Sequence, residues 1–354
     1  MTTRLTLFIP ALTGRAGHEA RPALPPDLPA LETLLTRAQR RHGVSGGMTA
    51  SLFHLFGVNP SFATHHASPP EGDYPVAALT GLCDGLHDPT DGLWLRADPV
   101  HLAADRDRVV MTAHEQLAVS PAQARQLVDE FNGLFGEDGF VLHAPTPQRW
   151  YLRVPQPPNF SASAVDDVVG QDIDPHLPRG EEAMRWHRLL NEVQMLFHAS
   201  EVNQVRQQRG ELPVNSLWLW GGGGLPEAPP ASWSAVWSND IVSRALARYC
   251  RVAHHSLPPT AGEWLEHAGE GEHLVVMDGA RNALRHGDMT AWRTFLEGVD
   301  TEWIAPLTAA VKSAEVDEAL LLTGDGEAYC ATAKTLRRWW KRRRPLTCFQ
   351  VQPM

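Results

Sequence analysis

Short apolar runs alternate with amphipathic segments along the last third of the chain. The runs HLVVM at 273–277 and ALLL at 319–322 indicate buried strands, and 289–312 between them has the apolar spacing of helices. Strands that alternate with helices form a mainly parallel sheet covered by helices on both faces. The chain is therefore predicted to have an α/β fold built on a doubly wound, mainly parallel sheet.

Each of these two strands is followed by an acidic residue. Asp278 follows the first strand, Asp325 follows the second, and His286 lies eight residues after Asp278. The carboxyl ends of parallel strands meet at one edge of a sheet, where ligands bind in such folds. Two carboxylates and an imidazole at that edge could hold one divalent metal. The alternative is that each acid caps the next helix or binds loop amides.

A different pattern begins after residue 105. RVVMTA at 108–113 indicates a strand, Ser120 and Pro121 open an amphipathic helix, and 139–154 indicates two further strands. This order is typical of a small α+β unit. We predict an insertion, or lid, at 106–195 and an α/β core formed by 1–105 and 196–354. A long helix is expected to end at Gly210.

Composition limits the class of function. The 354 residues carry a formal net charge of −10, which argues against wholesale binding to nucleic acid or membranes. No apolar run approaches the roughly 18 residues of a membrane span, and the amino-terminal apolar run does not resemble a signal peptide. Four cysteines without C-x-x-C spacing indicate reduced thiols. These features predict a cytoplasmic protein.

The segment KTLRRWWKRRRPL at 334–346 is the strongest local charge feature. Basic residues around two tryptophans can bind single-stranded nucleic acid or another polyanion. The cations available for this are Arg337, Arg338, Lys341, Arg342, Arg343 and Arg344. The interpretation that we favour from the acidic net charge is a final helix with a basic solvent face and buried indoles.

Two other segments suggest contact with an anion. GGGG at 221–224 follows a strand, but it lacks the frame of a phosphate-binding loop, so a tight chain reversal is the alternative. EVNQVRQQRG places Asn203 and Arg206 on one helix face, which could bind an anion or face solvent.

Four blocks of the sequence together resemble the archaeal-type cofactor-independent phosphoglycerate mutases of the alkaline phosphatase superfamily, and also proteobacterial mutase-like proteins. The blocks are PDLPALETLLTRAQR, PVAALTGLCDGL with DGLWLRADPVHL, EVNQVRQQRGELPVNSLWLWGGG, and VVMDGARNALRHGDMTAWRTFLEGVDTEWIAPL with LLLTGDG. The resemblance implies an alkaline phosphatase-like core with a lid. It also implies an anion site for a small phosphorylated metabolite between core and lid, with Arg96, Asn203, Arg206 and Asn215 facing the substrate.

The sequence departs from this family at the positions of the catalytic serine and of the metal ligands. The family mechanism needs two divalent ions and a serine that carries the phosphoryl group. Here FIPALTG follows the first strand without an acid, Met48 stands at the position of the serine, and Gly326 replaces a histidine. Thr49 is adjacent to Met48, while Ser45 and Ser51 are out of register. No histidine follows His286.

We therefore expect a pseudoenzyme, a mutase-like protein without phosphoryl transfer that needs no cofactor and binds a ligand or a protein partner. One alternative is an active phosphoglycerate mutase or phosphatase with rearranged ligands and one divalent metal, Mn²⁺ or Zn²⁺, on Asp278, His286 and Asp325. The other alternative is a regulator that binds a polyanion through its basic carboxyl-terminal segment.

Overall fold

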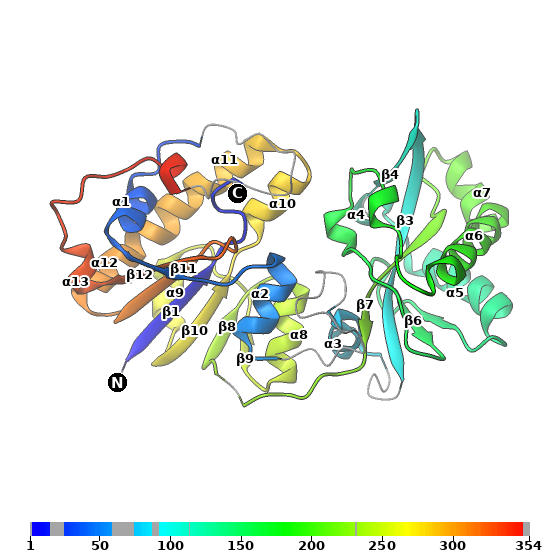
Figure 1. Ribbon diagram of the computed structural model, residues 1–354, viewed down its shortest axis with the longest axis horizontal. Coiled ribbons are helices and arrows are strands. Elements are labelled where there is room, and N and C mark those ends of the chain that lie inside the picture. The colour runs from blue at the N-terminus through cyan, green and yellow to red at the C-terminus, as the bar shows by residue number, and fades with distance from the viewer. Residues whose placement is uncertain are drawn as a thin grey trace. The chain divides into compact units, whose positions relative to one another are not determined.

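The computed structural model describes residues 2–14, 25–58, 74–86, 92–112, 114–230 and 232–349. The chain forms two compact units, each with its own sheet (Figure 1). Residues 1–58 and 228–354 form the first, which we call the core unit, and residues 59–227 form the second, which we call the antiparallel unit.

The core unit contains a seven-stranded sheet in the order β2-β12-β11-β1-β10-β8-β9. The pairs β1–β10, β1–β11, β10–β8 and β8–β9 are parallel, whereas β12 runs antiparallel to β11 and β2. This confirms the predicted fold class. The strands are β1 (Thr3–Phe8), β2 (Gln39–His42), β8 (Ala235–Trp237), β9 (Ala253–His255), β10 (Gly271–Val276), β11 (Glu318–Leu322) and β12 (Glu327–Thr332).

The central strands of this sheet are apolar at consecutive positions and are buried on both faces, whereas the edge strands β2 and β9 are mostly exposed. Leu5 and Leu7 of β1 pack in a cluster with helix residues such as Leu31 and Leu307, while Phe8 on the opposite face is also fully buried. The helices of the unit are α1 (Pro29–Arg37), α2 (Gly47–Leu55), α8 (Ile241–Tyr249), α9 (Ala261–His267), α10 (Gly279–Arg285), α11 (Met289–Gly298), α12 (Ala305–Ser313) and α13 (Ala333–Leu336).

A buried acid fixes the start of α1. Leu28 at the N-cap offers no side-chain acceptor, and the first helical amides would otherwise have no partner. Asp300, in a π-helical stretch between α11 and α12, accepts hydrogen bonds from the amides of Leu31 at 2.6 Å and Ala30 at 3.4 Å. A residue 269 positions away thus supplies the cap that the local sequence lacks.

The antiparallel unit is organised around the long strand β3 (Leu93–Asp105). It pairs with β4 (Arg108–Thr112), β6 (Tyr151–Val154) and β7 (Ser216–Gly223), and β5 (Val141–His143) pairs with β6. The helices are α3 (Val76–Asp84), α4 (His114–Leu117), α5 (Pro121–Phe135), α6 (Ala183–Ala199) and α7 (Glu201–Gln208). The Ser120 hydroxyl caps α5 in a capping box with Gln123, as the sequence predicts.

This unit is wider than the insertion predicted at 106–195. The reason is the antiparallel pairing of β3 with β7, which joins two segments that the sequence analysis assigned to the α/β core. The predicted long helix is also two helices. Ser200 ends α6 in an extended conformation, and its hydroxyl accepts a hydrogen bond from the Val202 amide at 3.2 Å, so it opens α7.

The glycine run is part of a strand and does not form the predicted tight reversal. β7 extends through Gly223, whose φ of 142° is open mainly to glycine. A Cβ at Gly222 would lie 2.6 Å from the Leu95 side chain, and one at Gly223 would lie 2.9 Å from Pro75. The glycines therefore allow β7 to approach its neighbours closely. In the part of the chain that the structure describes, no helix has the length and apolarity to cross a bilayer.

Candidate functional site

The carboxyl edge of the core sheet places the two predicted acids on either side of β1. Asp278 lies just beyond β10 and Asp325 just beyond β11, and both strands are parallel neighbours of β1. The segment that follows β1 begins Ile9-Pro10-Ala11, without an acid. The two carboxylates are therefore separated by one strand that contributes no charged ligand.

Asp325 is held by neighbouring hydroxyls and a loop amide. Its Oδ2 accepts a hydrogen bond from the Thr13 hydroxyl at 3.2 Å. Its Oδ1 accepts one from the Thr323 hydroxyl and one from the Glu327 amide at 3.3 Å. Both carboxylate oxygens thus have protein donors, and this arrangement is the loop-binding alternative of the sequence analysis.

Asp278 and His286 lie at opposite ends of α10. Asp278 is the N-cap residue, but its side chain makes no cap bond and instead accepts from the Asn282 amide group at 2.9 Å. His286 is the C-cap residue and is exposed. His286 comes eight positions after Asp278, which corresponds to about 12 Å along the helix axis. The structure does not bring His286 beside Asp278.

Helix α2 carries the position of the missing nucleophile. Met48 is its second residue, is only 5% exposed, and its sulfur lies 4.0 Å from a guanidinium nitrogen of Arg281 in α10. Thr49 and Ser51 are also buried in α2. The exposed Ser45 precedes the helix, and its Cβ lies 3.8 Å from where a Cβ on Gly326 would stand. A thioether thus faces the helix that follows Asp278.

These residues do not fit the two-metal centre that the resemblance implies. Within the described ranges, no group of three or more His, Cys, Asp or Glu side chains gathers closely enough to hold a metal ion. The donors around Asp325 are hydroxyls and an amide, and the sulfur of Met48, which lies beside Arg281, belongs to a neutral thioether. Hard divalent ions prefer carboxylate oxygen, and Zn²⁺ prefers imidazole or thiolate.

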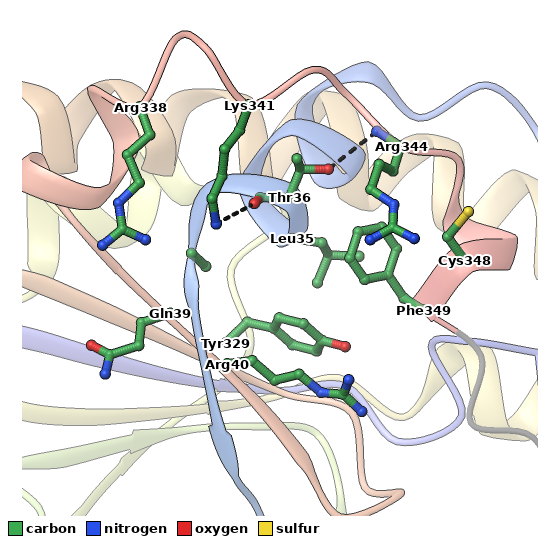
Figure 2. Close-up of a pocket in the computed structure, with 11 residues that line it drawn as sticks. Leu35, Thr36, Gln39, Arg40, Tyr329, Arg338, Lys341, Arg344, Cys348 and Phe349 are labelled. Atoms are coloured by element: carbon green, nitrogen blue, oxygen red, sulfur yellow. Dashed lines mark hydrogen bonds between the residues drawn. The ribbon is translucent and has the colours of Figure 1, made fainter.

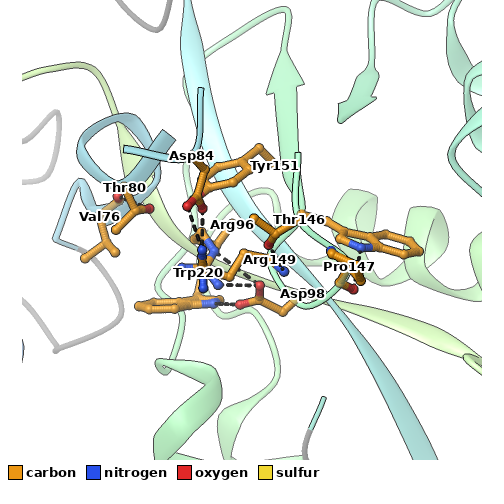
Figure 3. Close-up of polar contacts among 11 residues, drawn as sticks. Val76, Thr80, Asp84, Arg96, Asp98, Thr146, Pro147, Arg149, Tyr151 and Trp220 are labelled. Atoms are coloured by element: carbon orange, nitrogen blue, oxygen red, sulfur yellow. Dashed lines mark hydrogen bonds and ion pairs between the residues drawn. The ribbon is translucent and has the colours of Figure 1, made fainter. Parts of the chain in front are cut away.

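Arg96, the predicted substrate arginine, is a buried residue of the antiparallel unit (Figure 3). Its guanidinium donates to Asp98 Oδ1 at 2.5 and 3.2 Å and lies between the rings of Tyr151 and Trp220, at 5.4 and 5.2 Å from their centroids. Trp220 Nε1 donates to the other oxygen of Asp98 at 2.7 Å. Burial opposes the charged form, but Asp98 outweighs it, so the pKa of Arg96 is raised.

Asp84 forms a second centre in the same region (Figure 3). It accepts two hydrogen bonds from Arg149, at 2.6 and 2.7 Å, and one from the Tyr151 hydroxyl at 2.5 Å. Burial raises the pKa of the Asp84 carboxyl, but the bonds from Arg149 and Tyr151 outweigh it, so the pKa is lowered. Tyr151 therefore joins the two pairs: its hydroxyl binds Asp84, and its ring contacts Arg96. Arg96 is thus surrounded by protein groups that hold its position and its charge.

The other three predicted anion-binding residues are bonded to the protein itself. Asn203 donates to the carbonyls of Phe197 and Val214, at 2.7 and 2.8 Å, and accepts from the Val214 amide. Arg206 donates to the carbonyls of Leu212 and Leu117. Asn215 forms a reciprocal pair with the backbone of Leu102. All of these bonds lie within the antiparallel unit, and they join its segments.

The basic carboxyl-terminal segment does not form the helix that we favoured from the sequence. Helix α13 ends at Leu336, residues 337–345 are turns and irregular backbone, and a short 3-10 helix follows at Leu346–Phe349. Trp339 and Trp340 are 78% and 64% exposed, and their rings form an edge-to-face pair. The prediction of buried indoles was therefore wrong.

The sequence analysis missed the partners of the predicted residues. Arg96 and Asp98 stand two positions apart on one strand, so strand periodicity places them on the same face, and this signal could have paired them. No sequence signal links Asp84 to Arg149, which lies 65 residues away.

Comparisons with known proteins support the resemblance. The chain is 31% identical over 186 residues to a probable 2,3-bisphosphoglycerate-independent phosphoglycerate mutase of Geobacter sulfurreducens, covering 52% of this chain and 44% of that protein. It is 22% identical over 192 residues to the 2,3-bisphosphoglycerate-independent phosphoglycerate mutase of Methanosarcina barkeri, covering 53% and 44%. The matches span less than half the length of these relatives. No protein-family model matches the chain.

The fold has a relative among solved structures. A protein from Pyrococcus horikoshii superposes with a TM-score of 0.56 at 14% identity, covering 94% of this chain and 87% of that one. This likeness supports the α/β fold. The sequence matches confirm the kinship with cofactor-independent phosphoglycerate mutases that the four sequence blocks indicated.

Proposed function

We propose that this relative of the 2,3-bisphosphoglycerate-independent phosphoglycerate mutases has lost metal-dependent phosphoryl transfer and acts as a ligand- or partner-binding regulatory protein. Phosphoryl transfer by a covalent route needs a side chain that attacks phosphorus and an electrophile that neutralises the developing charge. The proposal is that the carboxyl edge of the core sheet supplies neither.

The single observation that supports this most is the environment of Met48. The residue at the position of the nucleophile is a buried thioether, and the neighbouring hydroxyls of Thr49 and Ser51 are buried in the same helix. The second support is Asp325, whose two oxygens are already bonded to Thr13, Thr323 and Glu327. A metal there would have to compete with these protein donors for the carboxylate oxygens.

An activity assay tests the proposal. We expect no conversion of 3-phosphoglycerate to 2-phosphoglycerate, and no release of phosphate from either, with Mn²⁺, Zn²⁺ or Mg²⁺ added. Turnover would contradict the proposal, and variants would then locate the nucleophile. Activity that is lost in Thr49→Ala or Ser51→Ala, but kept in Ser45→Ala, would identify a displaced hydroxyl and establish the active-enzyme alternative.

A stability measurement distinguishes a metal-free carboxyl edge, as proposed here, from a site that holds one metal ion. If Asp325 only binds its loop, Asp325→Asn keeps an acceptor oxygen and is expected to change the free energy of unfolding by about 1 kcal/mol or less. A chelator is then expected to leave the melting temperature of the wild type unchanged. Asp278→Asn serves for comparison on the other side of β1. The Asp278 carboxylate also has a protein partner, Asn282, so a similarly small change in the free energy of unfolding is expected.

The one-metal alternative gives the opposite result. A bound ion adds stability by mass action, so removing it lowers the melting temperature. A drop on adding chelator in the wild type that is absent from both Asp278→Asn and Asp325→Asn would establish a shared metal. Metal analysis of protein purified without chelator gives the stoichiometry of that ion.

A further inference from the structure

A basic pocket lies at the outer edge of the core sheet, and its lining includes neither Asp278 nor Asp325. It has a volume of about 520 Å³ and is lined by the end of α1, by β2 and β12, and by residues 338–349 (Figure 2). This volume is within the range of about 300–1,000 Å³ that is usual for small-molecule sites. We define the basic pocket by Arg40, Tyr329, Arg338, Lys341, Arg344 and Cys348.

Four of the residues that line the pocket are cations and none is a carboxylate. Arg40 is paired with Glu327. In the described part of the chain, Arg338, Lys341 and Arg344 form no ion pair. Lys341 donates to the Thr36 carbonyl at 3.3 Å, and Arg338 donates to the Arg37 carbonyl at 3.4 Å. Carbonyl contacts hold these side chains on the wall but do not neutralise their charge.

Two acids near the carboxyl-terminal segment, Asp27 and Glu32, pair with an arginine outside the pocket. Arg343 pairs with Asp27 at 3.0 Å and with Glu32 at 3.4 Å, and it does not line the pocket. The Glu32 carboxylate also accepts the Leu346 amide at 2.9 Å, which fixes the segment beside α1. The same arrangement that anchors the segment therefore leaves three unneutralised cations around one cavity, on a chain whose net charge is −10.

The floor of the pocket is apolar. The buried Tyr329 ring packs edge-to-face with Phe349, at 5.9 Å between centroids, and Leu35 lies beside them (Figure 2). Burial raises the pKa of Tyr329 to about 12, so its hydroxyl stays protonated at neutral pH. A ligand can thus place its negative charges among the cations and an organic body against the half-buried Phe349 ring. Guanidinium groups bind phosphate oxygens through paired N–H donors.

We propose that the basic pocket binds a small organic phosphate with at least two negative charges, of the size of a nucleoside diphosphate. The proposal does not depend on the loss of phosphoryl transfer, because the pocket shares no residue with the carboxyl edge. In this proposal Arg338, Lys341 and Arg344 bind a small molecule in a concave site. They do not form an extended surface for nucleic acid.

Cys348 provides a reporter inside the pocket. It lines the cavity and is exposed, whereas Cys250 and Cys330 are buried and Cys83 is half-buried. The experiment measures how fast Cys348 reacts with N-ethylmaleimide, a neutral reagent, and identifies the modified peptide by mass. The probes are ADP, pyrophosphate and adenosine without added metal, at matched ionic strength. We expect ADP and pyrophosphate to slow the reaction at least fivefold, and adenosine to leave it unchanged.

Matched variants locate the effect. Lys341→Ala combined with Arg344→Ala removes two lining cations, and we expect ADP to bind at least tenfold more weakly and to lose its protection of Cys348. Arg337→Ala combined with Arg342→Ala removes two cations of the same segment that do not line the pocket, and here protection is expected to persist. Protection should also weaken as salt is raised, because screening reduces charge attraction. Circular dichroism confirms that both double variants are folded.

Four outcomes would overturn the proposal. The first is that neither ADP nor pyrophosphate protects Cys348 at low salt. The second is equal protection in the two double variants, which would place the anion elsewhere. The third is protection by a single-stranded oligonucleotide alone, lost in Trp339→Ala, which would make the segment a nucleic-acid surface. Protection by adenosine alone would likewise exclude an anion site.

Discussion

Asp98→Ala is expected to lower the free energy of unfolding by about 3–5 kcal/mol, because it leaves the charge of Arg96 buried without a partner. Asp98 is completely buried and Arg96 is 3% exposed. The substitution also leaves the Trp220 indole N–H without its acceptor. Urea unfolding followed by tryptophan fluorescence and circular dichroism measures the loss.

The same strand offers a matched control. Asp105, also in β3, pairs with Arg108 at 2.9 Å, but both side chains are about half exposed. Exposed ion pairs contribute about 0–1 kcal/mol, so Asp105→Ala is expected to have a small effect. Combining Asp98→Ala with Arg96→Met removes both charges and is expected to recover part of the stability. An Asp98→Ala effect no larger than that of Asp105→Ala would show that Arg96 does not depend on Asp98.

Replacing Asp84 by Asn is expected to lower stability by about 2–3 kcal/mol at pH 7, with an effect that disappears in acid. The carboxylate is nearly buried and holds Arg149 and Tyr151, whose hydrogen bonds lower its pKa in the folded state below the usual value. The unfolded chain then takes up a proton before the folded chain does. The stabilisation by Asp84 is thus present above about pH 4 and is lost as the pH falls through the folded pKa.

The pH dependence is what identifies the charge of Asp84 as the cause. The difference in stability between the wild type and Asp84→Asn should be largest near neutral pH and should shrink as the pH falls below about 4, since the wild type then loses its carboxylate too. Arg149→Met should show the same pH profile, because it removes the other half of the pair. A difference that stays constant across this range would assign the loss to packing.

The core unit was predictable because its signals are local. The leucines of α1 and the apolar runs of β10 and β11 each determine an element from neighbouring residues, as the Ser120 cap of α5 does in the antiparallel unit. Parallel pairing then places Asp278 and Asp325 at one edge of the sheet. Those features follow from periodicity and need no knowledge of distant contacts.

The roles of the candidate site residues could not be predicted in the same way. An arginine at a strand position is compatible with a substrate or with a buried acid, and only the fold shows that Asp98 faces Arg96. The same holds for Asn203, whose amide joins two backbone segments. The antiparallel pairing of β3 with β7 also depends on residues more than a hundred positions apart, and it widens the second unit beyond the prediction.

The insertion of one unit within the other has a consequence for how the chain is made. Arg4 of β1 pairs with Glu272 of β10, 268 residues later, and β11 on the other side comes later still. Chains are synthesised at about 5–20 residues per second. The strand β10, with which β1 pairs, is therefore made roughly 15–50 seconds after β1. The antiparallel unit, made in between, can fold during that time. An apolar strand with both edges open is prone to aggregate, so the newly made chain should depend on chaperones that shield β1.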